Sequence, residues 1–588
     1  MKKINKQEFR LFLKFLKYLL PYRKKGIIIL FLSGVSVLLG VALPYLSKLA
    51  VDKGIIGKEL KSFIIFGAIG TGLFIINGLV NAVSALFKRS VNLRVNFDLN
   101  KKVFSHLQNL PLNFFQNRST GEHMFRVNYD IDRVVDLVVS IPEEIIKIFP
   151  RMLFILAIIF YLNWQMALFA LVLAPIMYLP VHYVTFRMRK ILEELLTNSQ
   201  DIFKRMEEVF SHIHLVKALG KEKAETRSYL KALIARIKIR LRNVRLEVFG
   251  SFAGGSCERI IIGLITLFGG YLVIKEQMTA GTLAAIMIYL GQLIGLQNSV
   301  AFFFQRVVMG LVSCNRLNEV LQENSLAPEI GKPKVRIIFD NPRIEFKKVR
   351  FGYCEGEDVL RDIEFNLEKG VISLAGLSGC GKTTILNLIL GIYKPGKGKV
   401  LIQGRNIEEL DKVFLKQQIS VALQEPFLWN DSIENNIKYA KKNASRNEVV
   451  ETAALAGVDE FVKSLPQGYE TVIGENACKL SEGQKQKIAI ARALINKPKI
   501  LILDEAMSSM DSYSEEKIMS NIRSLPIDIV IVVSHRLSTI MACDSVYFLK
   551  SPNNILAGAP RKLIAEVREF SELFAGQIEA LSHNSASA

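Results

Sequence analysis

A glycine-rich stretch in the second half of the chain has the residue types and spacing needed to hold a phosphate group. It fits the pattern G-x-x-x-x-G-K-[ST] and reads Gly376-Leu377-Ser378-Gly379-Cys380-Gly381-Lys382-Thr383-Thr384. The apolar run 370–375 predicts a buried strand before it and the run 385–390 a helix after it, a context that disfavours a chance match. Glycines allow backbone N–H groups to surround a phosphate, and a helix N-terminus attracts negative charge. Lys382 is then expected to bind the β- and γ-phosphates of a nucleotide, and Thr383 to offer its hydroxyl to Mg²⁺.

Two adjacent carboxylates end another apolar run. Residues 500–503 predict a buried strand, and Asp504 and Glu505 follow it directly. Asp504 suits Mg²⁺ bound through water, and Glu505 suits the polarisation of an attacking water molecule. His535 follows a further predicted strand at 529–533, where it is able to contact a γ-phosphate, although a histidine so placed is more often structural.

Further candidates for nucleotide contact lie at the ends of other predicted elements. Gln424 follows a strand-like run at 419–423, and its carbonyl is able to ligate Mg²⁺ and to sense a neighbouring domain. Tyr353 follows the alternating run 343–351, where its ring is able to stack on adenine or is an ordinary turn tyrosine. A helix start binds anions, and one is predicted just before 485–496, at Ser481-Glu482-Gly483-Gln484.

The composition indicates a chain with a membrane part and a water-soluble part. Its 588 residues predict two or more domains, and 50% of them are hydrophobic with a net charge of +21. That charge suits a nucleic acid or an anionic membrane surface, and the apolar runs favour the membrane. The six cysteines are scattered without a C-x-x-C pair, which argues against a disulfide framework or a zinc site. We expect no cleavable signal peptide, because no small-residue cleavage site follows the first apolar run.

Long apolar runs in the first half predict six membrane spans. The first two runs, 26–49 and 63–87, are each roughly long enough to cross ~30 Å of hydrocarbon. The gaps 88–144 and 185–248 are long and rich in Lys and Arg, whereas the other gaps are short. The positive-inside rule therefore places the N-terminus, both long gaps and the phosphate-binding part in the cytoplasm. The predicted spans are 26–49, 63–87, 145–162, 167–184, 249–274 and 283–296.

The segments around these spans show helical spacing. Basic and apolar residues interleave over 1–25, which predicts an amphipathic helix on the inner leaflet, or else a soluble helix that packs on another domain. The stretches 187–205 and 231–246 combine helical spacing with mixed charge. We interpret them as transmembrane helices that continue well into the cytosol.

Polar side chains inside the predicted spans are costly in lipid and therefore informative. Lys147 and Arg151 lie one turn apart, and Arg259 lies in the fifth span. They either line a polar substrate cavity or make structural contacts, and for Lys147 snorkelling to a helix end is favoured. An anionic part of the cargo is one hypothesis for the partner of Arg151 and Arg259, and a carboxylate from another helix is the other. The remaining polar residues of this kind are Asn77, Asn81 and Glu258.

The order of these motifs resembles the nucleotide-binding domain of an ATP-binding-cassette transporter. The matching features are Tyr353, the glycine loop, Gln424, the LSEGQ sequence at 480–484, the LILDEA sequence at 501–506, the SSMD sequence that ends at Asp511, and His535. Six spans ahead of such a domain resemble the half-transporter exporters of the P-glycoprotein and lipid-A-flippase type. Segments 110–115 with 120–122, and 214–220, resemble the two cytoplasmic coupling loops of these exporters.

The resemblance implies a multidomain fold: a six-helix α-helical transmembrane domain at 1–321, a linker at 322–342, and an α/β P-loop ATPase domain at 343–588. It implies that ATP and Mg²⁺ bind between the glycine loop of one subunit and the LSEGQ signature of another. A homodimer is expected, with a heterodimer open, in a bacterial inner membrane with the N-terminus and ATPase domain cytoplasmic. The implied activity is ATP hydrolysis that drives an amphipathic lipid, drug or peptide out of the cytoplasm or inner leaflet by alternating access.

The resemblance also assigns roles to individual residues. Glu505 and His535 are the expected catalytic residues, and Thr383, Gln424 and Asp504 the expected Mg²⁺ ligands. The expected nucleotide contacts are Tyr353, Gly376, Ser378, Gly379, Cys380, Gly381, Lys382, Thr383, Thr384, Gln424, Ser481, Gly483, Gln484 and Asp511.

Two alternatives and three departures qualify this prediction. A cassette ATPase that acts on nucleic acid would lack the spans, and an ATP-gated channel would need a regulatory insert that the sequence does not show. Glu482 stands where the family favours glycine, so its side chain must point away from the γ-phosphate, and hydrolysis is expected to be slower. Residues 474–477 replace the usual Gly-Glu-Arg-Gly, and residues 551–554 blur the usual strand-and-glycine ending.

Overall fold

The chain folds into two compact units that we describe separately. The computed structural model describes residues 6–116, 126–323, 335–353 and 356–578. The membrane unit comprises Met1–Leu110 and Phe114–Ala327, and the nucleotide unit comprises Pro111–Asn113 and Pro328–Ala588. The predicted coupling residues 120–122 and the linker residues 324–334 lie outside the described residues.

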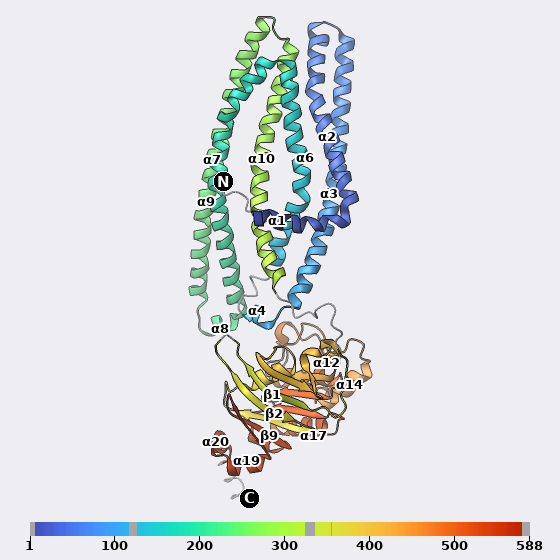
Figure 1. Cartoon of the computed structure of the whole chain (residues 1–588), viewed down its shortest axis with the longest axis vertical. Coiled ribbons are helices and arrows are strands. Elements are labelled where there is room, and N and C mark those ends of the chain that lie inside the picture. The colour runs from blue at the N-terminus through green and yellow to red at the C-terminus, as the bar shows by residue number, and fades with distance from the viewer. Residues whose placement is uncertain (1–5, 117–125, 324–334, 354–355, 579–588) are drawn as a thin grey trace. The chain divides into compact units, whose positions relative to one another are not determined.

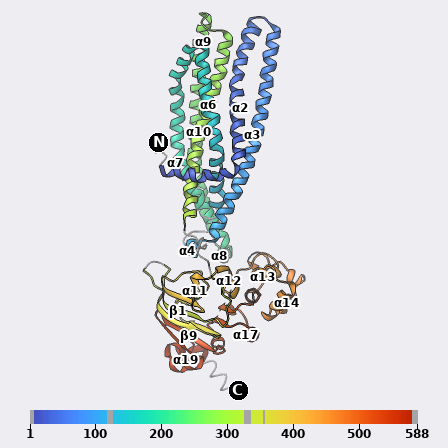
Figure 2. The same ribbon diagram turned by 45° about the vertical axis from the view of Figure 1, so that its right-hand side comes forward.

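Long helices packed in pairs form the membrane unit. α2 packs against α3, α7 against α9, and α6 against α10, with α6 and α10 between the other two pairs (Figures 1 and 2). Their bounds confirm that helices continue far beyond the apolar runs. These helices are α2 (Arg23–Leu49), α3 (Leu60–Gln108), α6 (Ile131–Leu162), α7 (Trp164–Ser211), α9 (Glu222–Ile274) and α10 (Ala280–Gln322).

Four helical segments are long and apolar enough to cross a membrane, among the residues that the structure describes. They are Arg10–Ile56, Leu60–Gln108, Arg126–Leu162 and Glu222–Ile274. α7 and α10 carry shorter apolar stretches, Trp164–Leu173 and Ala280–Leu296. The chain is therefore an integral membrane protein by helix length and composition, and the number of six spans stays a prediction.

Short helical segments connect and flank the long helices. α1 (Lys6–Leu16) runs across the long helices (Figure 1), where Phe15 is buried and Lys14 Nζ donates to Asn318 Oδ1 at 2.8 Å. α1 thus packs on its own unit, and a position on the membrane surface stays a prediction. The other short segments are η1 (Lys17–Tyr22), η2 (Ala50–Ile56), α4 (Leu112–Gln116), η3 (Arg126–Asp130) and α8 (Ile213–Ala218).

Two connections of the membrane unit are fixed by side chains that accept backbone N–H bonds. α6 and α7 are joined by Asn163 alone, and its Oδ1 accepts from the Met166 N–H at 2.9 Å. Asp52 accepts from the Gly281 N–H at 2.9 Å and from Thr279 Oγ1 at 2.8 Å, which ties η2 to the N-terminus of α10. Both are capping interactions that satisfy the otherwise unpaired N–H groups of a helix start.

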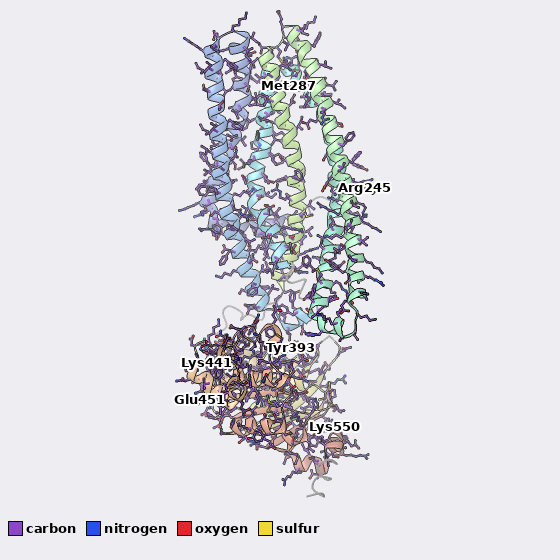
Figure 3. The ribbon with its side chains drawn as sticks, turned by 180° about the vertical axis from the view of Figure 1, so that it is seen from behind. Arg245, Met287, Tyr393, Lys441, Glu451 and Lys550 are labelled. Atoms are coloured by element: carbon purple, nitrogen blue, oxygen red, sulfur yellow. The ribbon has the colours of Figure 1, made fainter. Side chains whose placement is uncertain are left out.

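α9 and α10 also contact each other through an exposed threonine hydroxyl. Thr266 Oγ1 lies 3.6 Å from Met287 Sδ on α10, a residue that Figure 3 labels. The same hydroxyl bonds to the Ile262 carbonyl of its own helix at 2.7 Å. Helix pairs in this unit are thus joined by single polar side chains spaced along apolar surfaces, as is usual in lipid.

Two β-sheets form the centre of the nucleotide unit. An antiparallel sheet has the strand order β2-β1-β4-β5, and a six-stranded sheet has the order β10-β9-β3-β8-β7-β6. In the second sheet β3, β6, β7, β8 and β9 are parallel and β10 is antiparallel to β9. The strands are β1 (Ile344–Phe351), β2 (Leu360–Leu367), β3 (Gly370–Gly376), β4 (Lys397–Ile402), β5 (Arg405–Asn406), β6 (Ile419–Ala422), β7 (Ile500–Asp504), β8 (Ile529–Val533), β9 (Ser545–Ser551) and β10 (Asn554–Gly558).

Apolar cores on both faces of the parallel sheet hold its strand ends in place. α11 shares one core with both sheets, and α13, α14, α16 and α17 share the other. The α-helices of the unit are α11 (Lys382–Ile389), α12 (Lys412–Gln418), α13 (Ile433–Lys438), α14 (Arg446–Leu455), α15 (Asp459–Val462), α16 (Glu482–Leu494), α17 (Ser512–Arg523), α18 (Leu537–Met541), α19 (Pro560–Glu566) and α20 (Arg568–Leu573). The short helical turns are η4 (Ile407–Glu409), η5 (Gly468–Glu470) and η6 (Glu475–Ala477).

Two sequence expectations for this unit are refined by the structure. The expected blurring around residues 551–554 is wrong, because β9 and β10 form an antiparallel hairpin through this stretch. Residues 335–342, expected in the linker, contact the nucleotide unit: Phe339 is buried, and Val335 pairs with Leu410. The domain boundaries themselves stay a prediction.

Candidate functional site

The glycine loop connects the end of β3 to the start of α11. Gly381 is the last residue before the helix and has φ +106, a conformation that disfavours any side chain. A Cβ at this position would also approach Leu360 Cδ2 to 2.8 Å. Lys382 is buried, and its Nζ donates to the carbonyls of Gly376 at 2.8 Å and Leu377 at 3.0 Å. The predicted strand, loop and helix are confirmed, and the loop's own carbonyls hold the lysine inside it.

The two threonines at the start of α11 have different surroundings. Thr383 is exposed, so its hydroxyl is accessible to a metal ion. Thr384 is buried, and its Oγ1 lies 3.0 Å from the Tyr353 hydroxyl. The nucleotide contact of Thr384 stays a prediction.

Tyr353 sits at the edge of an aromatic cluster. Its ring is 38% exposed and lies against Phe351 and Tyr393, with centroid distances of 5.1 Å and 5.4 Å. Figure 3 labels Tyr393. The cluster fixes the position of Tyr353 and leaves part of its ring open to solvent, as base stacking requires.

Glu505 is the centre of a group of three side chains from neighbouring strand ends. Gln424 Nε2 donates to Glu505 Oε2 at 2.7 Å, and His535 Nε2 lies 2.9 Å from Glu505 Oε1. Glu505 has φ +50, an uncommon conformation that its N–H bond to the Val533 carbonyl at 3.0 Å helps to hold. The structure thus brings together three of the residues predicted from scattered motifs, because the carboxyl ends of β6, β7 and β8 meet at one edge of the sheet.

Asp504 precedes this group at the end of β7. Burial raises the pKa of its carboxyl, the negative charge of Glu505 raises it further, and Lys382 acts in the opposite direction. The surroundings of Asp504 thus disfavour its negative charge, and a cation near it would relieve that cost.

The signature, residues 480–484, forms the capped start of α16. The Gln484 N–H donates to Ser481 Oγ at 3.3 Å, and the Ser481 N–H donates to Gln484 Oε1 at 3.0 Å, which is a capping box. Gly483 lies close to the Ser509 carbonyl, which would be 3.0 Å from an added Cβ. Glu482 is exposed and pairs with Lys485 at 2.8 Å along the helix surface. The acid is thus neutralised locally and turned toward its own helix.

Other polar residues around the site act as structural supports. Asp511, predicted as a nucleotide contact, caps α17 by accepting from Ser514 N and Ser514 Oγ, both at 2.8 Å. Sequence reasoning missed Gln486, which is buried, donates to Ser508 Oγ at 3.1 Å and accepts from the Ser509 N–H at 3.1 Å. Its place two residues after the signature was the available signal.

Arg536 was also missed, although it directly follows His535. Its guanidinium donates to the carbonyls of Ser508 and Met510 at 2.9 Å and 2.8 Å, and to buried Glu515 at 2.6 Å. Arg536 therefore ties the segment after β8 to the segment after β7, which fixes how His535 and Glu505 face each other.

The residues expected to bind Mg²⁺ fit that ion by chemistry. The Thr383 hydroxyl, the Gln424 carbonyl and the Asp504 carboxylate are the hard oxygen ligands that Mg²⁺ prefers. The described residues hold no cluster of three or more His, Cys, Asp or Glu side chains that suits a metal.

The polar residues predicted inside the spans separate into two groups. Asn77, Asn81, Lys147 and Arg151 line one cavity of the membrane unit. Lys147 makes an ion pair, since its Nζ lies 2.6 Å from Glu143 Oε1 one turn away, and its snorkelling stays a prediction. Arg259 is exposed on α9 and does not belong to the described lining of this cavity, so its role stays a prediction.

Two protein-family models match the chain. The model described as the ABC transporter transmembrane region matches residues 27–297, and the model described as ABC transporter matches residues 360–508. Together they cover most of both units.

Individual proteins are similar over nearly the full length. A protein named putative multidrug export ATP-binding/permease protein from Staphylococcus aureus is 30% identical over 96% of this chain and 99% of its own length. An ATP-dependent lipid A-core flippase from Syntrophus aciditrophicus is 29% identical over 96% of this chain and 94% of its own length. The solved structure of a bacterial Atm1-family ABC exporter with ATP bound covers 95% of this chain and 98% of its own, with 25% identity and a TM-score of 0.82.

Proposed function

We propose how this chain works from the premise that it belongs to the ATP-binding-cassette (ABC) transporter family, in which it is an ATP-driven exporter. It combines a helical transmembrane domain with an α/β nucleotide-binding domain, and it hydrolyses ATP to drive transport. The proposal concerns the roles of individual residues, the assembly of the chains, their orientation in the membrane and the transported molecule.

Glu505 is the general base. One of its oxygens accepts a proton from the attacking water molecule, while Gln424 and His535 hold the carboxylate in place by the bonds described above. Lys382 exchanges the carbonyls of Gly376 and Leu377 for the β- and γ-phosphates, because phosphate oxygens are stronger acceptors for an ammonium group. Thr383, Gln424 and Asp504 would hold Mg²⁺, which would supply positive charge to the phosphate groups of the nucleotide.

A second copy of the chain completes each nucleotide site. Each copy presents one glycine loop and one signature, and Ser481, Gly483 and Gln484 at the start of α16 form an anion-binding helix terminus for the γ-phosphate of the partner's ATP. A homodimer then contains two sites with full sets of catalytic groups, because Glu505 and His535 are both present in the chain. Closure around ATP and release after hydrolysis drive the alternating access of the helices.

The nucleotide unit and the N-terminus face the cytoplasm, and the cargo is an amphipathic molecule. The basic segments 88–144 and 185–248 support this orientation, since positive segments stay inside. The names of the similar proteins, a lipid A-core flippase and a multidrug exporter, support a lipid or an amphipathic drug as cargo. A peptide stays open.

The observation that carries this proposal is the contact of Glu505 with both Gln424 and His535. The test is Glu505→Gln in purified protein reconstituted in liposomes. We expect the variant to bind ATP normally but to hydrolyse it about 10²–10⁴-fold more slowly, because the general base is lost. ATP-dependent export of a fluorescent amphiphile should fall in parallel.

The matched control is Glu470→Gln, an exposed carboxylate paired with Arg446 on the same unit. It should hydrolyse ATP like the wild type. Normal turnover in Glu505→Gln would contradict the assignment of the general base, and wild-type hydrolysis without export of any amphiphile would contradict the proposed cargo class.

A further inference from the structure

An open cavity of about 360 Å³ lies among α2, α3, α6 and α10 of the membrane unit. Its polar side includes Ser36, whose Oγ donates to Asn77 Oδ1 at 2.7 Å and to Asn81 Oδ1 at 3.0 Å. Neutral hydrogen-bonding groups thus meet inside helices that are otherwise apolar. Such groups are costly in lipid and are retained where they bind something or hold helices together.

The charges of the cavity are unequal. Lys147, Arg151 and Arg306 line it together with a single carboxylate, Glu144. Arg306 Nη1 pairs with Glu144 Oε1 at 2.7 Å. Glu143 pairs with both Lys147 and Lys88, whose Nζ atoms lie 2.6 Å and 2.9 Å from its carboxylate oxygens. The lysines therefore have one positive charge in excess over the carboxylate between them.

Arg151 has the weakest compensation in this group. Its Nη2 donates to the neutral Gln292 Oε1 at 3.2 Å, and its Nε is buried without a hydrogen-bond partner. In the described part of the chain no carboxylate pairs with it. Gln292 is itself held by the Gly40 carbonyl, toward which its Nε2 donates at 3.3 Å, and a Cβ on Gly40 would lie only 3.4 Å from Arg151 Nη2. The glycine therefore leaves space for the guanidinium, and Gln292 orients it.

Apart from Ser299, the rest of the lining is apolar. Val37, Ile148, Leu296 and Phe302 lie beside the charged groups. A guanidinium keeps its charge in lipid, so it needs an anion, and its planar donors suit a phosphate or a carboxylate. The apolar side chains beside it suit a hydrocarbon tail.

We propose that this cavity binds the anionic group, a phosphate or a carboxylate, of an amphipathic molecule, with Arg151 as its principal partner and Lys147 as the second cation. This inference rests on the proposed function, because it narrows the cargo class to amphiphiles with a negative headgroup. The same chemistry is offered by an anionic bilayer lipid and by a dissolved amphiphile or free phosphate.

Binding without nucleotide tests the inference independently of ATP hydrolysis. The full chain in phosphatidylcholine nanodiscs is titrated with dodecyl phosphate and, for comparison, with uncharged dodecyl maltoside, by isothermal titration calorimetry. We expect dodecyl phosphate to bind more tightly, and Arg151→Gln to weaken it by about tenfold, or 1.4 kcal/mol. Arg259→Gln is the matched control, since that arginine is exposed outside the cavity, and it should bind like the wild type.

Two further arms identify the source of the anion. If a bilayer lipid occupies the site, phosphatidylglycerol added to the nanodiscs should weaken the binding of dodecyl phosphate. If the free anion suffices, inorganic phosphate in the solution should weaken it. Competition by phosphatidylglycerol assigns the site to a bilayer lipid, and competition by inorganic phosphate assigns it to a free anion. If neither competes while dodecyl phosphate still binds through Arg151, the site takes a dissolved amphiphile.

A second variant keeps the inference falsifiable if Arg151→Gln does not fold. Ser299 lines the cavity, and Ser299→Trp fills it while Arg151 stays in place. Wild-type binding of dodecyl phosphate in the folded variants, or equal binding of dodecyl phosphate and dodecyl maltoside in the wild type, overturns the inference. If the wild type hydrolyses ATP and exports a neutral amphiphile but shows this result, the proposed function stands and the anion site alone is overturned.

Discussion

The nucleotide unit and the membrane unit hold their polar groups in different ways. In the nucleotide unit Lys382, Glu505 and Ser481 each lie where a helix or strand begins or ends, and backbone groups or neighbouring side chains satisfy them. In the membrane unit Arg151 and Asn77 lie in the middle of long helices and bond to single side chains of other helices. The first arrangement is set by local backbone geometry, and the second by how distant helices pack.

The largest expected effect comes from breaking a buried network of the nucleotide unit. Glu515 is buried and accepts from Arg536 Nη1 at 2.6 Å and from Thr539 Oγ1. Glu515→Ala removes the carboxylate partner of the Arg536 guanidinium and the acceptor of the buried Thr539 hydroxyl, so we expect the free energy of unfolding to fall by about 3–5 kcal/mol. Thermal or denaturant unfolding of the full chain measures this. The exposed neighbour in Glu516→Ala should change it by less than about 0.5 kcal/mol.

A smaller loss is expected from removing one of the two supports of Glu505. His535→Ala should reduce ATP turnover by about 100-fold while ATP binding is retained, because the base loses its orientation and not its charge. Steady-state hydrolysis and nucleotide binding by the purified variant separate the two. His212→Ala, at the exposed end of α7, should be normal. Equal turnover in both variants would show that Gln424 suffices to hold Glu505.

The matching test in the membrane unit should give a smaller effect than Glu515→Ala. Tyr289 is fully buried on α10, and its hydroxyl donates to the Val41 carbonyl of α2 at 2.6 Å. Tyr289→Phe should lower the free energy of unfolding in detergent or lipid by roughly 0.6–1.7 kcal/mol, which is the energy range of hydrogen bonds between membrane helices. Tyr271→Phe, at an exposed position on α9, serves as the control. A loss as large as that of Glu515→Ala would remove the contrast between the units.

The smallest effect is expected at the unusual acid of the signature. Because Glu482 is exposed and paired with Lys485 on its own helix, Glu482→Gln should lower stability by only a few tenths of a kcal/mol. ATP turnover should stay within about twofold of the wild type, since the acid is already neutralised. A severalfold increase in turnover would instead support the slower hydrolysis expected from sequence.

The sequence predicts the nucleotide unit well because its motifs encode backbone geometry. Gly381 is needed at φ +106, and parallel strands bring residues as distant as Gln424 and His535 to one sheet edge. What the motifs do not contain is the support around them. Gln486 and Arg536 act through packing partners that no local pattern identifies.

The membrane cavity was only partly predictable. Arg151 was identified as a cation in need of a partner, but the cavity around it is lined by its own helix and three others. Glu143 and Glu144 precede the apolar run of their helix, and Arg306 follows that of α10, so a search inside the apolar runs misses all three. Arg259 shows the converse, since its exposed position depends on which face α9 turns toward its neighbours.

The one-residue connection at Asn163 has a mechanical consequence. α6 ends at Leu162 and α7 begins at Trp164, and the first turn of α7 is capped by Asn163 itself. The connection therefore has no residue that is free of either helix. We therefore expect a tilt of the C-terminal end of α6 to move the N-terminal end of α7 with it. Inserting a few glycines at this connection would let α6 and α7 move independently, while every nucleotide contact stays intact.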